Sequence, residues 1–155
     1  MLKPIATRTV RTAGGHFAVV ASKYNGRYVD AMLRAATKEL KAAKVESVNV
    51  VRVPGAFEIP VVVAKLASSA TPRLAGIICL GVIFRGETTH AQQIADAVSH
   101  ALAQVQTDSK LPVIHGVYLF EHREQARVRC LGRTHNRGLE AARTALEMAK
   151  VMKAL

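Results

Sequence analysis

The sequence contains few aromatic side chains and few cysteines. Aromatic residues make up 5% of its 155 residues, which leaves little surface on which the bases of single-stranded nucleic acid could stack. The two cysteines, Cys79 and Cys130, form neither a disulfide framework nor the CxxC spacing of a metal site. We therefore expect reduced thiols in a cytoplasmic protein that binds no metal.

Long hydrophobic runs are also missing. No apolar stretch approaches the roughly 18–20 residues of a membrane-spanning helix. The basic residues near the N-terminus are not followed by the uninterrupted apolar core of a signal peptide. Half of the residues are hydrophobic and 21% are charged, which is ordinary for a soluble globular protein.

Acidic residues are scarce relative to basic ones. The chain has 11 acidic and 22 basic residues, which gives a formal net charge of +11. Such a charge favours anionic partners, among them phosphorylated metabolites, nucleic acid and acidic proteins. Because the basic residues are spread along the chain and not massed in one tract, we favour a solvated basic surface over a specific nucleic-acid site.

What the sequence does contain is an alternation of predicted strands and helices. Runs of β-branched and apolar residues predict strands over 16–21, 47–53, 74–83 and 111–119. Helical spacing of apolar residues predicts helices over 27–43, 57–69, 89–108, 121–131 and 136–152, although the valine run 61–63 would also suit a strand. This alternation implies parallel strands joined by right-handed crossovers.

The predicted fold is therefore α/β: a three-layer α/β/α sandwich around a four-stranded parallel sheet, similar to flavodoxin in type. We expect it to occupy residues 16–155 as a single domain, because a chain of this length commonly forms one core. Residues 1–15 are polar and basic and end in two glycines, so we interpret them as an extended N-terminal arm.

Residues suited to ligand binding follow the predicted strands, at the edge where open α/β folds bind ligands. After the first strand, Tyr24 offers a flat face to a heteroaromatic ring, and Asn25 offers both a donor and an acceptor. After the second, Gly55 and Ala56 permit close approach to the backbone, and Glu58 can accept hydrogen bonds from a polyol. After the fourth strand the sequence continues as Tyr118-Leu119-Phe120.

The richest stretch follows the third strand, within 81–95. It holds a cation (Arg85), two hydroxyls (Thr88 and Thr89) and an imidazole (His90) at the start of a predicted helix. Free N–H groups at a helix start favour anions, and an imidazole can transfer protons near neutral pH. Singly, each residue has a simpler explanation, since Thr88 can be only a helix cap. Their joint occurrence favours a site for a polar or anionic small molecule.

Taken in order, these motifs resemble those of the lumazine synthase family. The resemblance runs from the first strand to the last helix. It rests on five blocks: Tyr24-Asn25, VPGAFE at 53–58, GVIFRGETTH at 81–90, EQA at 124–126 with Arg129, and NRGLE at 136–140. It implies condensation of 5-amino-6-ribitylaminouracil with 3,4-dihydroxy-2-butanone 4-phosphate, the penultimate step of riboflavin biosynthesis, without a metal or organic cofactor.

The resemblance also implies roles for individual residues. His90 would transfer protons. The pyrimidine ring and the ribityl chain would be bound by Tyr24, Asn25, Gly55, Ala56, Phe57, Glu58, Val82, Ile83, Phe84 and His115. The phosphate would be bound by Gly86, Glu87, Thr88 and Arg129, with Arg137 and Glu140 in support.

A further implication is a homo-oligomer with each site between neighbouring subunits. Members of the family form pentamers, stacked decamers or sixty-subunit icosahedral shells. Arg129, Arg137 and the loop after the fourth strand would then reach the neighbour's site. The turn at 130–137 lacks the insertion associated with pentamer-only members, which leaves a shell open.

Five positions depart from the family pattern. His115 stands where a phenylalanine is usual, and we interpret it as a tolerated aromatic substitute, although its charge could instead perturb His90. The other departures are Ala91 for an aromatic residue, Gln92 for aspartate, Leu119 for threonine and Arg137 for lysine. They keep a second hypothesis open, an inactive relative that binds a flavin or lumazine or forms a shell.

Overall fold

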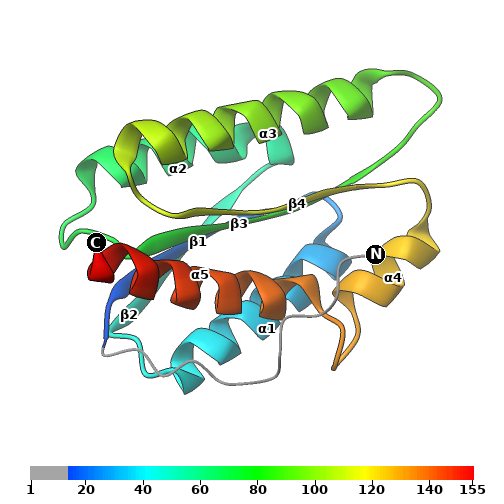
Figure 1. Cartoon of the computed structure of the whole chain (residues 1–155). Coiled ribbons are helices and arrows are strands. Elements are labelled where there is room, and N and C mark those ends of the chain that lie inside the picture. The colour runs from blue at the N-terminus through cyan, green and yellow to red at the C-terminus, as the bar shows by residue number, and fades with distance from the viewer. Residues whose placement is uncertain (1–13) are drawn as a thin grey trace.

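Four parallel strands form the centre of the molecule (Figure 1). The computed structural model describes residues 14–155, so residues 1–13 of the predicted arm lie outside the described part. The strands follow the order β2-β1-β3-β4. Their bounds are His16–Ser22 for β1, Ser47–Val53 for β2, Gly76–Phe84 for β3 and Val113–Phe120 for β4.

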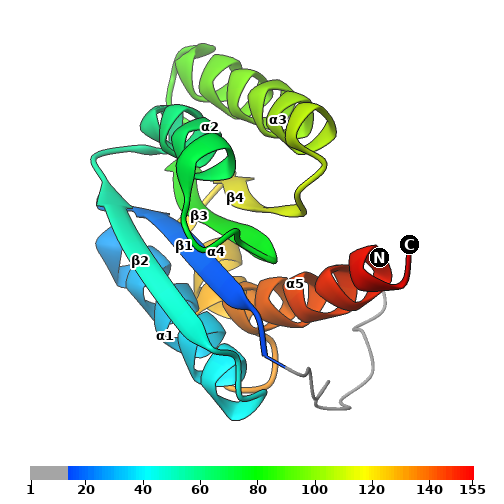
Figure 2. The ribbon, with the colours of Figure 1, turned by 90° about the vertical axis from the view of Figure 1, so that its left-hand side faces the viewer.

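Helices cover both faces of this sheet (Figures 1 and 2). On one face lie α1 (Gly26–Ala42), α4 (Arg123–Cys130) and α5 (Arg137–Ala154). On the other lie α2 (Ile59–Ser69), which follows the short 3-10 helix η1 (Ala56–Glu58), and α3 (His90–Ser109). The predicted three-layer sandwich is confirmed. The valine run 61–63 is helical, so the strand alternative for it is wrong.

The core consists of two apolar layers because neighbouring residues of a strand point to opposite faces. In β1, Phe17, Val19 and Ala21 pack toward α1 and α5, whereas Ala18 and Val20 pack toward α2 and α3. The central strand β3 is buried along almost its whole length. A parallel sheet covered on both faces demands this continuous apolar character, and it is why the strand runs were recognisable.

Two strands begin later than the sequence predicts. β3 begins at Gly76 and not at Leu74, and β4 begins at Val113, directly after Pro112. Pro112 has no N–H to donate to the ladder, although its carbonyl accepts a hydrogen bond from Ile77 N at 2.9 Å. Leu74 and Leu111 therefore lie at the amino edge of the sheet, where they line a groove.

Within the described part of the chain, no helix combines the length and the apolar character needed to cross a membrane. Cys79 and Cys130 are both free thiols and both buried. Burial raises the pKa of the Cys130 thiol to about 11, and it raises that of Cys79 further. Neither thiol is therefore poised for nucleophilic chemistry.

Candidate functional site

A pocket of about 980 Å³ opens at the carboxyl edge of the sheet. Its lining comes from the turns after β1, β2 and β3, from the first turns of α3 and from the start of α4. The turns predicted to meet at one edge therefore do meet there, except that Tyr118-Leu119-Phe120 contributes no lining residue. The volume lies within the range of small-molecule sites.

The turn after β1 is fastened to the central strand by Asn25. Its side-chain amide donates a hydrogen bond to Val82 O at 2.7 Å. Asn25 itself adopts a left-handed backbone conformation, with φ 56° and ψ 39°, which asparagine tolerates better than most residues. The preceding Tyr24 is 68% exposed and faces the pocket. The side chain of Asn25 thus holds the turn that presents the tyrosine ring.

The same turn is held from the other side by Arg52, which sequence reasoning did not single out. Its guanidinium donates to Ala21 O at 3.2 Å and to Ser22 O at 2.9 Å. It also forms an ion pair with Asp30 of α1 at 2.8 Å. These bonds occupy carbonyls at the end of β1 and keep the arginine out of the pocket.

The turn after β2 is a compact cap. The N–H of Gly55 donates to Glu58 Oε2 at 2.9 Å. A Cβ at position 55 would lie 2.9 Å from that oxygen and 2.9 Å from Cδ2 of Tyr24, so glycine permits the tyrosine ring to approach. Glu58 Oε1 has no partner among the described residues. One carboxylate oxygen therefore stabilises the turn, and the other is free for a ligand.

The turn after β3 leads into the N-terminus of α3. His90 is the first residue of this helix, is exposed and lines the pocket together with Gly86 and Thr88. The Thr89 side chain makes no capping hydrogen bond, and the His90 N–H donates to Thr88 Oγ1 at 3.3 Å. Other N–H groups of the first helical turn are left without helical partners, which suits an anion. Glu87 is exposed and does not line the pocket.

The predicted cation of this turn, Arg85, does not line the pocket. Its Nε donates to the carboxylate of Glu121 at 2.9 Å, and its Nη2 donates to Gln92 Oε1 at 2.8 Å. Gln92 in turn donates to Asp96 Oδ1 at 2.8 Å. Arg85 therefore ties the ends of β3 and β4 to α3 and has a positioning role.

Besides Glu87, four residues named for the site lie outside the pocket of their own chain: Arg129, Arg137, Glu140 and His115. Arg129 is exposed on α4 and forms no ion pair with another described residue. Arg137 pairs with Glu140, and its guanidinium carbon lies 6.0 Å from the centre of the Tyr118 ring. Burial raises the pKa of Tyr118 to about 12, despite the opposing charge of Arg137.

The fourth of these residues, His115, lies on the edge strand β4. Its Nδ1 accepts a hydrogen bond from Val117 N at 3.2 Å, so the proton of the neutral ring is on Nε2. This Nε2–H donates to Ser99 Oγ at 2.7 Å. Desolvation lowers the pKa of this imidazole, against an interaction with the backbone of His115 itself that raises it. The geometry favours a neutral His115, which argues against a charge effect on His90.

Several residues that line the pocket were not among those predicted from the sequence. Gln93, Ile94 and Ala97 follow His90 by three, four and seven positions, so they continue its helical face and could have been found by that spacing. Arg123 also lines the pocket, and its guanidinium carbon lies 5.3 Å from the centre of the Phe84 ring. It was hidden because the helix was predicted to begin at residue 121, which made Arg123 an interior position.

The pocket brings together most of the residues that the family resemblance assigns to the site. Comparison with known proteins tests the family assignment itself. The family model described as 6,7-dimethyl-8-ribityllumazine synthase matches residues 14–153. The chain belongs to the lumazine synthase family. All five sequence blocks that carry the resemblance lie within the matched range.

Individual lumazine synthases are similar in sequence to this chain over nearly its whole length. The 6,7-dimethyl-8-ribityllumazine synthase of Stenotrophomonas maltophilia (strain R551-3) is 39% identical over 141 residues, which is 90% of each chain. That of Xylella fastidiosa (strain M12) is 38% identical over 148 residues, 94% of this chain and 95% of the relative. Nothing in these comparisons favours the hypothesis of an inactive lumazine synthase relative.

Proposed function

We propose that the protein catalyses the lumazine synthase reaction in the carboxyl-edge pocket. The reaction condenses 5-amino-6-ribitylaminouracil with 3,4-dihydroxy-2-butanone 4-phosphate to give 6,7-dimethyl-8-ribityllumazine, phosphate and water. The observation that carries the proposal is the position of His90, which stands at an open helix N-terminus inside a pocket that also presents Tyr24 and Glu58. The reaction as proposed uses no metal and no organic cofactor.

The pyrimidine substrate fits the part of the pocket formed by the first two turns. The ring would stack on Tyr24 above the apolar floor of Val82, Ile83 and Phe84. The backbone of Ala56 and the free oxygen of Glu58 would receive the ribityl hydroxyls. Phe57 lines the same wall and is 61% exposed.

The phosphate of the second substrate fits the start of α3. Gly86 and Thr88 line the pocket there, and a hydroxyl together with backbone N–H groups forms a suitable cradle for a phosphate. Glu87 does not itself line the pocket, but it lies between these two residues in the chain and would contribute its backbone N–H. Arg129 of a neighbouring subunit would add a planar, bidentate cation, with Arg137 and Glu140 of that subunit in support.

His90 lies beside this phosphate cradle and would move the protons of the reaction. The amine adds to the ketone, water leaves as an imine forms, phosphate is eliminated, and the ring closes with loss of a second water. Each of these steps transfers a proton, which suits an imidazole. The rest of the acceleration would come from holding two substrates together in one pocket.

Growth of a riboflavin auxotroph tests the proposed function. In a bacterium from which lumazine synthase has been deleted, expression of this chain should restore growth without added riboflavin. The matched control is expression of the His90→Ala variant at the same level. If the wild-type chain accumulates in folded form and growth still requires riboflavin, the proposed function is wrong.

Glycine at position 55 should matter for binding of the pyrimidine. Gly55→Ala places a methyl group 2.9 Å from the Tyr24 ring, so the ring must turn away from its stacking position. We expect KM for the pyrimidine substrate to rise about two- to tenfold, which corresponds to the free energy of one aromatic contact. Steady-state kinetics measure the change, and an unaltered thermal unfolding midpoint serves as the control. An unchanged KM would remove Tyr24 from ring binding.

Arg123 should contribute to binding of the phosphorylated substrate, since its charge lies at the pocket. Arg123→Gln should raise KM for the butanone phosphate about two- to fivefold, as expected for a solvent-exposed charge contact. The matched control is Arg127→Gln on the same helix, where the arginine pairs with Glu124 outside the pocket. Equal effects of the two variants would show that only the overall charge matters.

We further propose that the chain assembles as a homopentamer, or a multiple of it, with each site completed by a neighbour. Three apolar side chains beside the pocket support this: Tyr24, Phe57 and Val61 are 68%, 61% and 69% exposed. A neighbour covering them would also bring its own Arg129 or His115 to the site. Light scattering should give a mass of five chains or a multiple of five. A fully active monomer would contradict the proposal.

The proposed setting is that of a single-domain cytoplasmic enzyme acting on small molecules. The two free, buried thiols are compatible with a reducing compartment. The domain would span residues 16–155, with residues 1–15 as an arm outside it. Whether pentamers close into an icosahedral shell is tested by the same light-scattering mass.

A further inference from the structure

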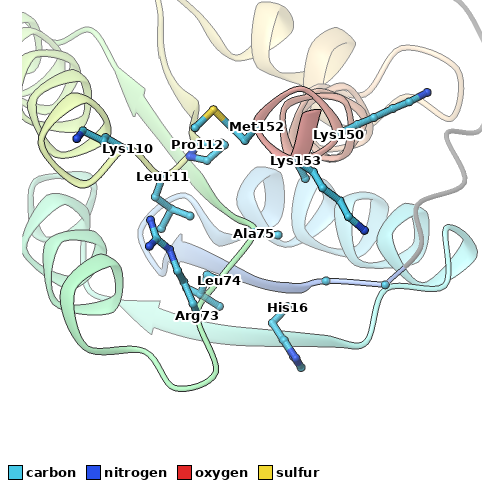
Figure 3. Close-up of a pocket in the computed structure, with 13 residues that line it drawn as sticks. His16, Arg73, Leu74, Ala75, Lys110, Leu111, Pro112, Lys150, Met152 and Lys153 are labelled. Carbon is cyan, nitrogen blue, oxygen red and sulfur yellow. The ribbon is translucent and has the colours of Figure 1, made fainter. Parts of the chain in front are cut away.

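A second groove, of about 600 Å³, opens at the amino edge of the sheet, opposite to the proposed active site (Figure 3). The segments that precede β1, β3 and β4 form one side of it, and the last turns of α5 form the other. Its lining comprises Gly14, Gly15, His16, Arg73, Leu74, Ala75, Lys110, Leu111, Pro112, Ala149, Lys150, Met152 and Lys153. None of these residues has a place in the proposed reaction.

The lining is strongly basic and contains no carboxylate. Arg73 and Lys153 come from opposite sides of the groove, with their charged ends directed away from each other, and Lys110 and Lys150 lie on its rim (Figure 3). None of these four side chains forms an ion pair or a side-chain hydrogen bond with another described residue. His16 differs, since its Nε2 lies 2.8 Å from a carboxylate oxygen of Glu46.

The floor between these cations is apolar. Leu111 and Pro112 are buried, Leu74 and Ala75 are half-buried, and Met152 lies at the opening with 37% of its surface exposed. A groove of this kind offers an apolar contact to the body of a ligand and cations to its charged end. Its volume falls in the range of small-molecule sites.

Stabilisation of helix ends does not account for all of this charge. Lys110 follows α3, and Lys150 and Lys153 lie in the last turns of α5, where cations offset the helix dipole. Each helix end carries about half a negative charge, so two ends balance about one of the four cations. Arg73 lies in the loop between α2 and β3, so it belongs to neither α3 nor α5.

The composition of the chain restricts what can occupy the groove. Residues 1–13 contain Lys3, Arg8 and Arg11 and no acidic residue, so the chain's own N-terminal segment cannot neutralise the cations. Apart from the paired His16, no aromatic ring lines the groove, which leaves no platform for stacking successive bases of a nucleic acid. A compact anion with an apolar body remains the best chemical match.

We propose that this groove binds an organic phosphate with two or more negative charges and a body of nucleoside size, such as a nucleoside diphosphate. Arg73 and Lys153 supply cations from opposite sides of the groove, and rotation of these long, unpaired side chains brings them to the phosphates. Leu74, Leu111 and Met152 contact the body. Lys110 and Lys150 raise the local positive potential. The site is independent of the proposed function, because it lies at the other edge of the sheet.

Isothermal titration of the assembled protein with ADP tests this proposal, with AMP and adenosine as a series of decreasing charge. We expect one site per chain, affinity that falls from ADP to adenosine, and weakening by added salt. The double variant Arg73→Gln/Lys153→Gln should weaken ADP binding about tenfold or more, since it removes two charge-assisted contacts. Lumazine formation by this variant should match that of the wild type.

The control is Lys38→Gln/Lys65→Gln, which removes the same charge from exposed positions on α1 and α2 that do not line the groove. It should leave ADP affinity unchanged. Three results would overturn the proposal: no saturable binding of ADP, equal weakening by the two double variants, or ADP binding that survives Arg73→Gln/Lys153→Gln. The last result would place the ligand at the carboxyl-edge pocket or elsewhere.

Discussion

Replacing Gly138 with alanine should destabilise the protein by about 3 kcal/mol, the upper range for overpacking a core. A Cβ at this position would lie 2.0 Å from the main-chain oxygen of Met32 and 2.5 Å from its carbonyl carbon. Both atoms belong to the backbone of α1, so no side-chain rotation can relieve the clash. The alanine must push α5 away from α1 and expose the buried residues between them, among them Ala142.

Denaturant titration measures this effect, and Gly26→Ala is the matched control. Gly26 also lies in the first turn of a helix, but its nearest contact for a new Cβ is Asp30 Oδ2 at 3.7 Å, an ordinary distance. There the higher helix propensity of alanine should leave stability unchanged or raise it by up to about 1 kcal/mol. If Gly138→Ala unfolds at the wild-type denaturant concentration, the close packing of α1 on α5 is wrong.

The second large effect is expected from His90→Ala. Loss of a general acid–base group typically lowers a rate by about a hundredfold or more, and we expect that decrease in kcat for lumazine formation. KM should change less, because Tyr24, Glu58 and the helix N-terminus bind the substrates in the proposed site. The fold should persist, since His90 is exposed and its side chain makes no hydrogen bond with a described residue.

A second histidine of the same helix provides the control. His100 is exposed on α3 and does not line the pocket, so His100→Ala should retain the wild-type kcat. If His90→Ala and His100→Ala turn over at the same rate, His90 does not transfer protons in this reaction. Another group of the pocket would then have to do so.

The sequence predicted the fold well because the sheet is buried on both faces. β1 and β3 had to be continuous apolar runs, and α1 had to place Val29, Met32 and Leu40 on one buried stripe. The carboxyl-edge turns were also predictable, because strand direction alone brings them together. The first residues of the strands were harder to predict, because Leu74 and Leu111 are as apolar as the strands that they precede.

The candidate site was predicted less completely than the fold. A cation in a turn looks the same in a sequence whether it binds a ligand or another side chain, and Arg85 proves to pair with Glu121. Arg123 was concealed by a helix boundary two residues from its true position. The role of Arg52 depends on its contact with the end of β1, which no local pattern in the sequence reports.

The family resemblance assigns four residues to a site that we propose to be formed with a neighbouring subunit. The resemblance gives a role in the site to Arg129, Arg137, Glu140 and His115. All four lie outside the pocket of their own chain. Their roles stay predictions about the assembled protein. A decrease in activity with Arg129→Ala that is relieved by mixing subunits with a His90→Ala variant would assign Arg129 to the neighbour's site.

The condensation assay with purified protein tests the central claim most directly. The protein is mixed with 5-amino-6-ribitylaminouracil and 3,4-dihydroxy-2-butanone 4-phosphate, and lumazine formation is followed by its absorbance against a mixture without protein. We predict saturable formation of 6,7-dimethyl-8-ribityllumazine far above the uncatalysed rate, without added metal or cofactor. A rate equal to the uncatalysed background from folded, assembled protein would contradict the account.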